Sequence, residues 1–228
     1  MIVFDLDDTL YLERDFAFSA YDALDAHIRE STGRPGFAAA CRAAFLAGRR
    51  ARVFDEALAA LGLPADPAAI ADMVARYRGH APRIELCPDA ARCLDRLHGT
   101  VRLGLVTDGP ETMQRAKIAA LGIADRFDAL RPTGAWGPGF AKPHPRAFAE
   151  MEAAAVGVAS LVYVADNPAK DFVTPRARGW LTVQVCRADR VHTTPAADAA
   201  HAAHAQIDSL DALETALTAF GHPLAGSR

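Results

Sequence analysis

The stretch of sequence that decides the fold is residues 1–9, which read Met1-Ile2-Val3-Phe4-Asp5-Leu6-Asp7-Asp8-Thr9. The apolar run at the start predicts a short buried strand, and two carboxylates follow it two positions apart. Because side chains alternate faces along an extended strand, Asp5 and Asp7 are expected on one side. Two like charges held close together are costly unless a cation or a proton lies between them. The pattern therefore predicts a metal site, a shared proton, or both.

Alternation of strands and helices extends this first strand into a fold. Apolar runs typical of buried parallel strands occur at Ile2–Leu6, Val101–Val106, Leu161–Ala165 and Leu181–Val185, and each is followed by a helical pattern. A fifth run surrounds Phe127–Leu130. This order predicts an α/β fold with a doubly wound, Rossmann-like parallel sheet. Ligands on such sheets bind beyond the carboxyl ends of the strands, where several of these runs end in polar residues.

The segment from 14 to 83 has a different pattern. It lacks strand-like runs and is rich in alanine, leucine and arginine at helical spacing, with breaks at 32–36 and 62–64. We expect an inserted bundle of three or four helices, with residues 1–13 and 84–228 forming the catalytic core. The pattern from Ile207 to Phe220 predicts a terminal helix that covers the sheet.

Composition limits the class of protein. The chain has 228 residues, 51% of them hydrophobic, and a net charge of −3, which favours neither nucleic acid nor an anionic membrane as a partner. Its four cysteines form no CxxC pair, which fits reduced thiols. No apolar run approaches the roughly 18 residues of a membrane span. Because the first strand begins at residue 2, no signal peptide is expected, and we predict a cytoplasmic protein.

Three further motifs follow the first. Thr107-Asp108-Gly109-Pro110 ends a strand and begins a helix, so its hydroxyl and free amides predict an anion-binding pocket. Lys142 precedes a proline, and it is one of only three lysines in the chain, with Lys117 and Lys170. Its ammonium suits a phosphate oxygen. Asp166 and Asp171 follow another strand, and Asp166 is expected to join Asp5 around a hard cation, most simply Mg²⁺.

With these four motifs in order, the chain resembles the haloacid dehalogenase (HAD) superfamily of hydrolases. The resemblance is to the phosphatase branch that carries a helical cap inserted after the first motif. The family pattern DxDxT matches Asp5, Asp7 and Thr9, and the threonine of its second motif matches Thr107. Its lysine matches Lys142, and its last acidic pair matches Asp166 and Asp171.

The resemblance implies a mechanism. Asp5 is the expected nucleophile, which forms an aspartyl-phosphate, and Asp7 the general acid and then base. Mg²⁺ is expected on Asp5, the Asp7 carbonyl and Asp166, supported by Asp171; Mn²⁺ or Co²⁺ can substitute in vitro. Phosphate oxygens are expected on Thr107, Lys142 and the amides near Asp108 and Gly109.

Elementary chemistry agrees with these roles. A carboxylate attacks an anionic phosphate poorly unless charge is first neutralised, which Mg²⁺ and Lys142 would do. Crowding by Asp5 is expected to raise the pKa of Asp7, so that it carries a proton near neutral pH. The predicted function is Mg²⁺-dependent hydrolysis of a small phosphorylated metabolite.

The sequence also bears on other activities that occur on this fold. Dehalogenases of this type lack the acid that corresponds to Asp7, which argues against that activity. Phosphonate-cleaving members need a lysine in the cap, and none occurs between Leu10 and Leu86. A phosphomutase shares every core residue named and stays an alternative, as does a catalytically idle regulatory module.

The cap is expected to set substrate specificity. Four arginines are candidates to reach a polar or anionic group of the substrate. They are Arg14, near the hinge, and Arg49, Arg50 and Arg52. A solvated helix face explains the same cluster. The cap and the last motif are loosely similar to sugar-phosphate phosphatases, including the N-acylneuraminate-9-phosphate type, so a sugar phosphate is the first substrate class to test. The oligomeric state is left open.

Overall fold

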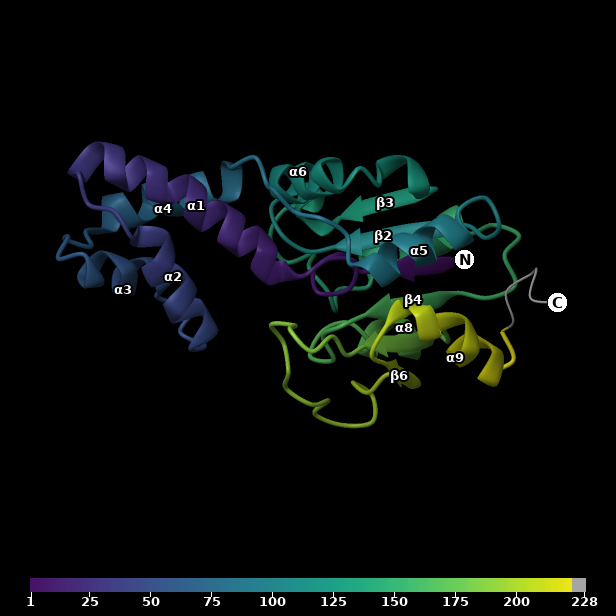
Figure 1. The fold of residues 1–228 in the computed structure, drawn as a ribbon. Coiled ribbons are helices and arrows are strands. Elements are labelled where there is room, and N and C mark those ends of the chain that lie inside the picture. The colour runs from purple at the N-terminus through teal and green to yellow at the C-terminus, as the bar shows by residue number, and fades with distance from the viewer. Residues whose placement is uncertain (223–228) are drawn as a thin grey trace. The chain divides into compact units, whose positions relative to one another are not determined.

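The computed structural model describes residues 1–222 of the chain, which divides into two compact units. The first comprises Met1–Glu13 and Glu85–Arg228, and the second Arg14–Ile84 (Figure 1). Residues 223–228, which the sequence assigns to the core, lie outside the described part. Among the described residues, no helix combines the length and apolar character needed to cross a membrane.

The first unit is built on a parallel sheet, which within residues 1–222 has six strands in the order β3-β2-β1-β4-β5-β6. The strands are β1 (Ile2–Phe4), β2 (Leu103–Thr107), β3 (Ala129–Pro132), β4 (Val162–Ala165), β5 (Leu181–Val185) and β6 (Ala205–Ile207). Every paired strand runs parallel to its neighbour, with Ile2 opposite Leu103 on one side and Val162 on the other. The predicted α/β class with a doubly wound sheet is confirmed.

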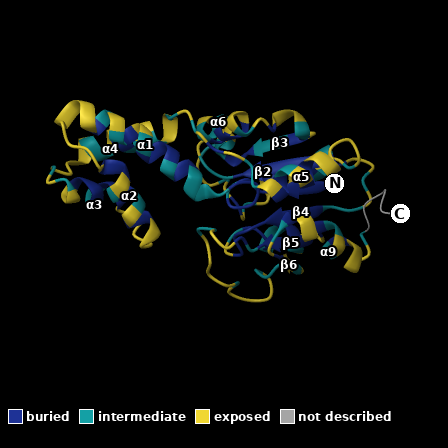
Figure 2. Cartoon of the chain, in the orientation of Figure 1, coloured by how far each residue is buried: buried dark blue, intermediate teal, exposed yellow. Residues whose placement is uncertain are grey.

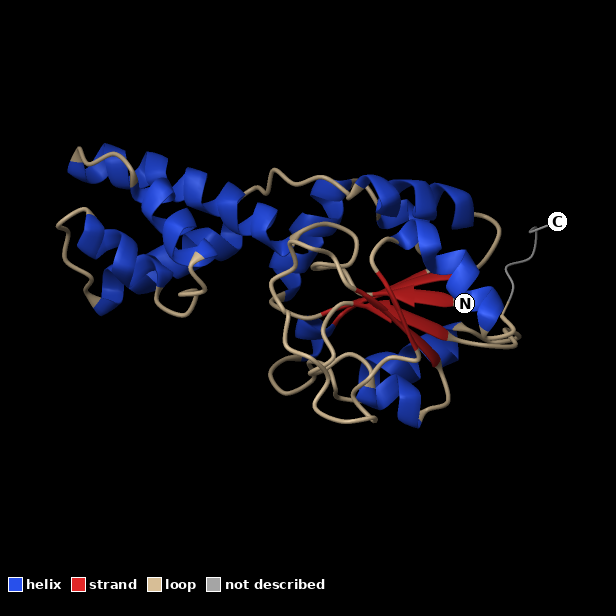
Figure 3. Cartoon of the chain, turned by 60° about the horizontal axis from the view of Figure 1, so that its bottom comes forward, coloured by secondary structure: helices blue, strands red, loops and turns tan. Residues whose placement is uncertain are grey.

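Helices lie on both sides of this sheet (Figure 3). The α-helices of the unit are α5 (Pro88–Leu97), α6 (Glu111–Leu121), α7 (Arg146–Ala154), α8 (Val173–Ala177) and α9 (Leu213–Ala219), and the short 3-10 helices are η1 (Ala124–Arg126), η2 (Thr133–Trp136) and η3 (Leu210–Ala212). Covering both faces buries the central strands completely, as their dark blue colour in Figure 2 shows. This burial explains why the strands read as apolar runs rather than as alternating patterns.

One hydrophobic cluster shows how a helix reaches the sheet. Phe148 and Met151 of α7 pack in the same cluster as Tyr163 of β4 and Trp180. At Gly104 of β2, an added Cβ would lie 2.9 Å from the Met151 sulfur, which is closer than real contacts allow. The missing side chain therefore lets α7 approach the strand.

The chain end differs from its prediction. Strand β6 was not predicted, because its alanine-rich sequence lacks a strand pattern. The helix predicted over Ile207–Phe220 begins only at Leu213, after η3, and ends at Ala219. Ile207 belongs instead to the edge strand, where it pairs with Val185.

The second unit is helical. Its helices are α1 (Glu13–Thr32, which begins in the first unit), α2 (Phe37–Leu46), α3 (Val53–Ala60) and α4 (Pro67–Gly79). Aromatic rings form its centre, including Phe16 edge-on to Tyr77 at 5.4 Å and Phe37 stacked on Phe54 at 6.2 Å. Asp66 caps α4 by accepting from the amides of Ala68 and Ala69. That this unit acts as a cap stays a prediction.

Candidate active site

The motif residues meet at the carboxyl edge of the sheet. Asp5 directly follows β1, Thr107 ends β2, and Asp166 directly follows β4. In this strand order the connections on the two sides of the β1–β4 pair run in opposite directions, and the crevice at such a reversal is where ligands bind in doubly wound folds. The topology thus explains how residues more than 100 positions apart share one site.

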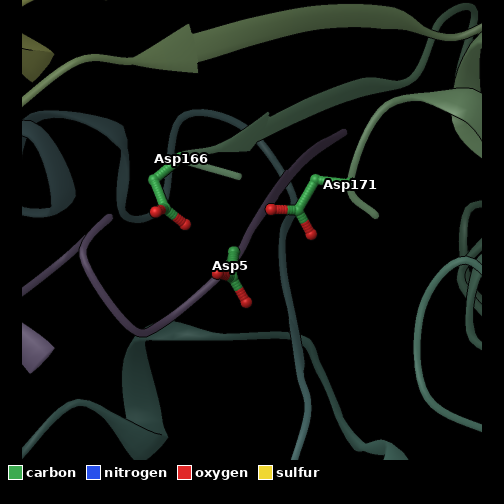
Figure 4. A group of neighbouring side chains, drawn as sticks. All are labelled: Asp5, Asp166 and Asp171. Atoms are coloured by element: carbon green, nitrogen blue, oxygen red, sulfur yellow. The ribbon is translucent and has the colours of Figure 1, made fainter. Parts of the chain in front are cut away.

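Three carboxylates form a buried cluster there. Asp5, Asp166 and Asp171 each offer an oxygen, and these oxygens lie within 4.8 Å of one another (Figure 4). Oδ2 of Asp166 is buried and accepts no hydrogen bond from the described residues. A buried carboxylate oxygen without a donor is costly, and a hard cation that prefers oxygen ligands would satisfy it. The residues present therefore fit Mg²⁺.

Crowding shifts the acidity of this cluster. Burial, and then the charges of Asp5 and Asp171, raise the pKa of Asp166 to about 9. Burial also raises the pKa of Asp5 to about 6, although Lys142 acts in the opposite direction. Both shifts express chiefly the cost of removing these carboxylates from water, to which the neighbouring negative charges add.

Lys142 supplies one compensating positive charge. Its Nζ lies 2.6 Å from Oδ1 of Asp5 and 2.8 Å from Oδ1 of Asp171, and it donates to the Tyr163 hydroxyl at 3.0 Å. Burial lowers the pKa of Lys142, but the charges of Asp171 and Asp5 outweigh this and leave the pKa well above its ordinary value. The ammonium therefore stays charged beside Asp5.

Asp7 is held by partners that the sequence did not predict. Its Oδ1 accepts from Nζ of Lys117 at 2.6 Å and from the hydroxyl of Tyr11. The expectation that crowding raises the pKa of Asp7 is wrong. Burial does act upward, but the charge and hydrogen bond of Lys117, with the Tyr11 hydrogen bond, lower the net pKa below its ordinary value.

The loop after β2 is fixed by a buried glutamine. Gln114, in the first turns of α6, lies 3.1 Å from the Thr107 hydroxyl through its Oε1 and donates through Nε2 to the Asp108 carbonyl at 2.6 Å. Gly109 has φ of 126°, a conformation that favours glycine, and a Cβ there would meet Gln114 at 2.6 Å. The proposed phosphate loop is thus tied to the helix that follows it.

The side chain of Asp108 anchors this loop to two others. Its Oδ1 accepts from the Thr133 hydroxyl at 2.9 Å and from the backbone amide of Lys142 at 3.0 Å, while Oδ2 accepts from Nζ of Lys170 at 3.0 Å. Burial raises its pKa, but Lys142 and Lys170 bring the net value below the ordinary one. Asp108 therefore joins the second, third and last motifs as a carboxylate.

The turn after Asp5 has its own supports. Asp8 adopts φ of 53°, uncommon for a residue with a side chain, and its carboxylate accepts from the amides of Glu13 and Val191. The Thr9 carbonyl accepts two hydrogen bonds from Arg187, at 3.1 and 2.7 Å. These contacts hold the turn that carries Asp7.

The predicted specificity arginines are engaged within the helical unit. Arg49 pairs with Glu56 at 2.6 Å and Arg52 with Asp55 at 3.2 Å. The guanidinium of Arg50 lies over the Phe45 ring, 4.7 Å from its centre. Nε of Arg14 lies 3.7 Å from Oδ1 of Asp15. Their role in specificity stays a prediction.

Sequence reasoning missed Lys117, Gln114, Tyr11 and Tyr163. One signal was available, since lysine is scarce in this chain. All three lysines lie at the site, with Lys117 on Asp7, Lys142 on Asp5 and Lys170 on Asp108.

Comparison with known proteins decides the family. Residues 1–174 match the family described as haloacid dehalogenase-like hydrolases. The chain belongs to this family. It is 38% identical over 176 residues to a phosphoserine phosphatase of Thermus thermophilus, and 33% identical over 111 residues to an (S)-2-haloacid dehalogenase of Xanthobacter autotrophicus. These alignments cover 75% and 48% of this chain, and the chain spans 66% and 41% of the lengths of those two relatives.

A solved structure of a HAD phosphatase from Thermococcus onnurineus resembles this chain along its length. The TM-score is 0.61 with 20% identity, and the match covers 98% of this chain and 99% of the other. Likeness at this identity shows the fold alone. Because the sequence relatives include both a phosphatase and a dehalogenase, the choice of reaction depends on the residues of the site.

Proposed function

We propose that this HAD-family hydrolase is a Mg²⁺-dependent phosphomonoesterase that acts through an aspartyl-phosphate on Asp5. The observation that carries the proposal is the setting of Asp5, whose carboxylate lies beside the Lys142 ammonium and forms the acidic cluster with Asp166 and Asp171. A nucleophile for an anionic phosphate needs positive charge of this kind close by.

In the first step, a carboxylate oxygen of Asp5 attacks phosphorus and the bond to the leaving oxygen breaks. Lys142 neutralises phosphate charge, and Thr107 with the amides of Asp108 and Gly109 binds phosphoryl oxygens. Bound Mg²⁺, held by Asp5, Asp166 and the Asp7 carbonyl and supported by Asp171, would add electrostatic stabilisation of the phosphoryl group. The leaving oxygen takes its proton from Asp7.

In the second step, Asp7 accepts a proton from the water that attacks the aspartyl-phosphate, which regenerates Asp5 and releases phosphate. Because the pKa of Asp7 in the free protein is lowered, Asp7 must take up a proton as the substrate binds. The negative charge of a bound phosphate beside Asp7 favours that uptake.

The dehalogenase relative makes a second reaction worth weighing. A dehalogenase of the resembled type has no acid at the position of Asp7, whereas here that acid is present and bound by two donors. The three-carboxylate cluster also serves a cation that such a reaction does not need. Both features favour phosphate as the substrate group.

The deciding experiment measures phosphate release from a panel of phosphomonoesters, with and without Mg²⁺, for the wild type and Asp5→Asn. The panel includes phosphoserine, after the Thermus relative, and sugar phosphates, after the loose similarity of the cap. We expect Mg²⁺-dependent release that is lost in Asp5→Asn. No phosphate release from any phosphomonoester would contradict the hydrolase and leave a mutase, seen as isomerisation of a sugar phosphate once a bisphosphate is added, or an idle module.

The specificity arginines are tested on the preferred substrate of that panel. We expect Ala substitution of at least one of Arg14, Arg49, Arg50 and Arg52 to lower kcat/KM about tenfold or more. Unchanged kcat/KM in all four variants would show that these arginines only form the helix surface.

A further inference from the structure

Helix α6 buries polar side chains where a helix on a sheet normally buries apolar ones. Its buried residues are Gln114, Lys117 and Ile118. Lysine is almost never fully buried unless it is paired, so a lysine in this place points to a specific partner. That partner is Asp7, whose Oδ1 lies 2.6 Å from the Lys117 ammonium.

A second buried donor reaches the same oxygen. The chain turns after Asp7 and forms a parallel bridge between Asp7 and Tyr11, whose hydroxyl donates to Oδ1. Tyr11 is completely buried, and the Lys117 ammonium lies 5.9 Å from the centre of its ring. Both of these hydrogen bonds fall on Oδ1 and neither on Oδ2. Two donors on one oxygen define which way the carboxylate faces.

We propose that Lys117 and Tyr11 are positioning residues that lock the carboxylate of Asp7 by Oδ1, so that Oδ2 is the atom that exchanges protons with the leaving group and with water. This inference rests on the proposed function, in which Asp7 is the acid and base. General acid–base catalysis requires hydrogen-bond geometry at the reacting atom, and a locked carboxylate meets that requirement before the substrate binds.

Helix α6 connects the Lys117–Asp7 contact to the proposed phosphate loop. Gln114 and Lys117 are three residues apart on α6, so they share one face, where Gln114 holds the Thr107–Asp108 loop and Lys117 holds Asp7. A single rigid element thereby sets the distance between bound phosphate and the proton donor.

The test uses two substrates of the same shape that differ in their need for a proton. Phenyl phosphate releases phenolate, which needs the acid, whereas 4-nitrophenyl phosphate releases a stable anion that does not. Wild type, Lys117→Met and Tyr11→Phe are assayed on both with Mg²⁺. Arg115→Met is the matched control, because Arg115 lies on the same helix but is exposed and pairs only with Glu111 among the contacts shown.

We expect Lys117→Met to lower kcat/KM about 10²-fold for phenyl phosphate and about threefold or less for 4-nitrophenyl phosphate. With 4-nitrophenyl phosphate, the first step does not need Asp7 as an acid, but water attack on the aspartyl-phosphate still needs it as a base. The second step should therefore slow, so that kcat and KM fall together and kcat/KM changes little. Tyr11→Phe should show the same pattern with a loss of about tenfold. Arg115→Met should match the wild type.

Several outcomes would overturn the inference. An equal loss on both substrates in Lys117→Met and Tyr11→Phe would mean that the pair only maintains the fold, and no loss would mean that Asp7 needs no lock. If Lys117→Met does not fold by circular dichroism, Tyr11→Phe decides alone, since it removes one hydroxyl and no charge. A wild type inactive on the whole phosphomonoester panel would refute the proposed function itself, and the inference with it.

Discussion

At the scale of single residues, the site is organised by hydrogen bonds to motif side chains rather than by the motifs alone. Asp108 and Gln114 each connect segments that the sequence shows only as separate pieces. A buried polar group that loses its partner keeps its full desolvation cost. Substitutions of these connecting residues should therefore affect both stability and activity.

Gln114→Leu tests this expectation. The leucine fills a similar volume but leaves the Asp108 carbonyl without its donor and the Thr107 hydroxyl without its partner. We expect a loss of about 1–3 kcal/mol in the free energy of unfolding and a roughly tenfold loss in kcat/KM. Denaturant unfolding and phosphate release measure the two effects. A variant with wild-type kcat/KM would show that the loop holds its shape without Gln114.

Gly134 provides a test of backbone packing. A Cβ there would lie 2.1 Å from the Gly109 carbonyl oxygen and 2.9 Å from the Glu111 amide, so the backbone itself must move. We expect Gly134→Ala to destabilise the protein by about 2 kcal/mol or more. Gly79→Ala is the control, because nothing lies within 4 Å of that Cβ, and its unfolding free energy should change by about 0.5 kcal/mol or less.

At the scale of elements, one buried ion pair ties α5, the segment after β5, and η3 to the catalytic turn. Arg187 donates to both oxygens of Asp89 at 3.0 Å and to the Thr9 carbonyl, and Asp89 also accepts from the Leu210 amide at 2.7 Å. Removing one partner of such a pair leaves an uncompensated charge.

Asp89→Asn should therefore cost about 3–5 kcal/mol in unfolding free energy at neutral pH. Burial acts to raise the pKa of Asp89, but hydrogen bonds from Leu210 and Arg187 lower the net value below the ordinary 3.8. Because the pKa of Asp89 is lower in the folded than in the unfolded protein, the ionised carboxylate stabilises the fold at every pH above the unfolded-state pKa. This contribution is lost as the pH falls through the folded-state pKa. The difference between wild type and variant, measured by urea unfolding, should shrink below about pH 4. A constant difference down to pH 2 would contradict this account.

At the scale of the whole molecule, the acidic cluster makes the thermal stability of the protein depend on metal binding. Gathering Asp5, Asp166 and Asp171 at the carboxyl edge of the sheet costs stability, because burial and mutual charge disfavour the ionised forms of Asp5 and Asp166, and a bound cation would offset that cost. We expect the wild type to gain about 5–10 °C in Tm in saturating Mg²⁺.

Asp166→Asn should have a higher Tm than the wild type without Mg²⁺ and should lose most of the Mg²⁺-induced gain. Glu30→Gln, which changes an exposed carboxylate on the helical unit, should keep the wild-type response. Thermal unfolding in EDTA and in Mg²⁺ measures both. A full Mg²⁺ response in Asp166→Asn would place the cation elsewhere.

The sequence by itself determined the sheet class and five of the strands, because buried parallel strands leave apolar runs and their ends carry the polar motifs. It did not predict β6, whose pairing with β5 depends on position at the sheet edge rather than on an apolar pattern. It also predicted which motif residues belong to one site, because parallel strands bring their carboxyl ends to one edge.

Only the tertiary structure decided how those residues are held. Lys117 is 110 positions from Asp7, and nothing in the local pattern of α6 marks its ammonium as the partner that lowers the pKa of that acid. The same applies to Asp108, whose motif predicts a phosphate loop while its side chain joins three segments. Local sequence encodes strands and turns through periodicity and backbone preference, whereas the partner of a buried charge is set by which distant side chains the fold brings within reach.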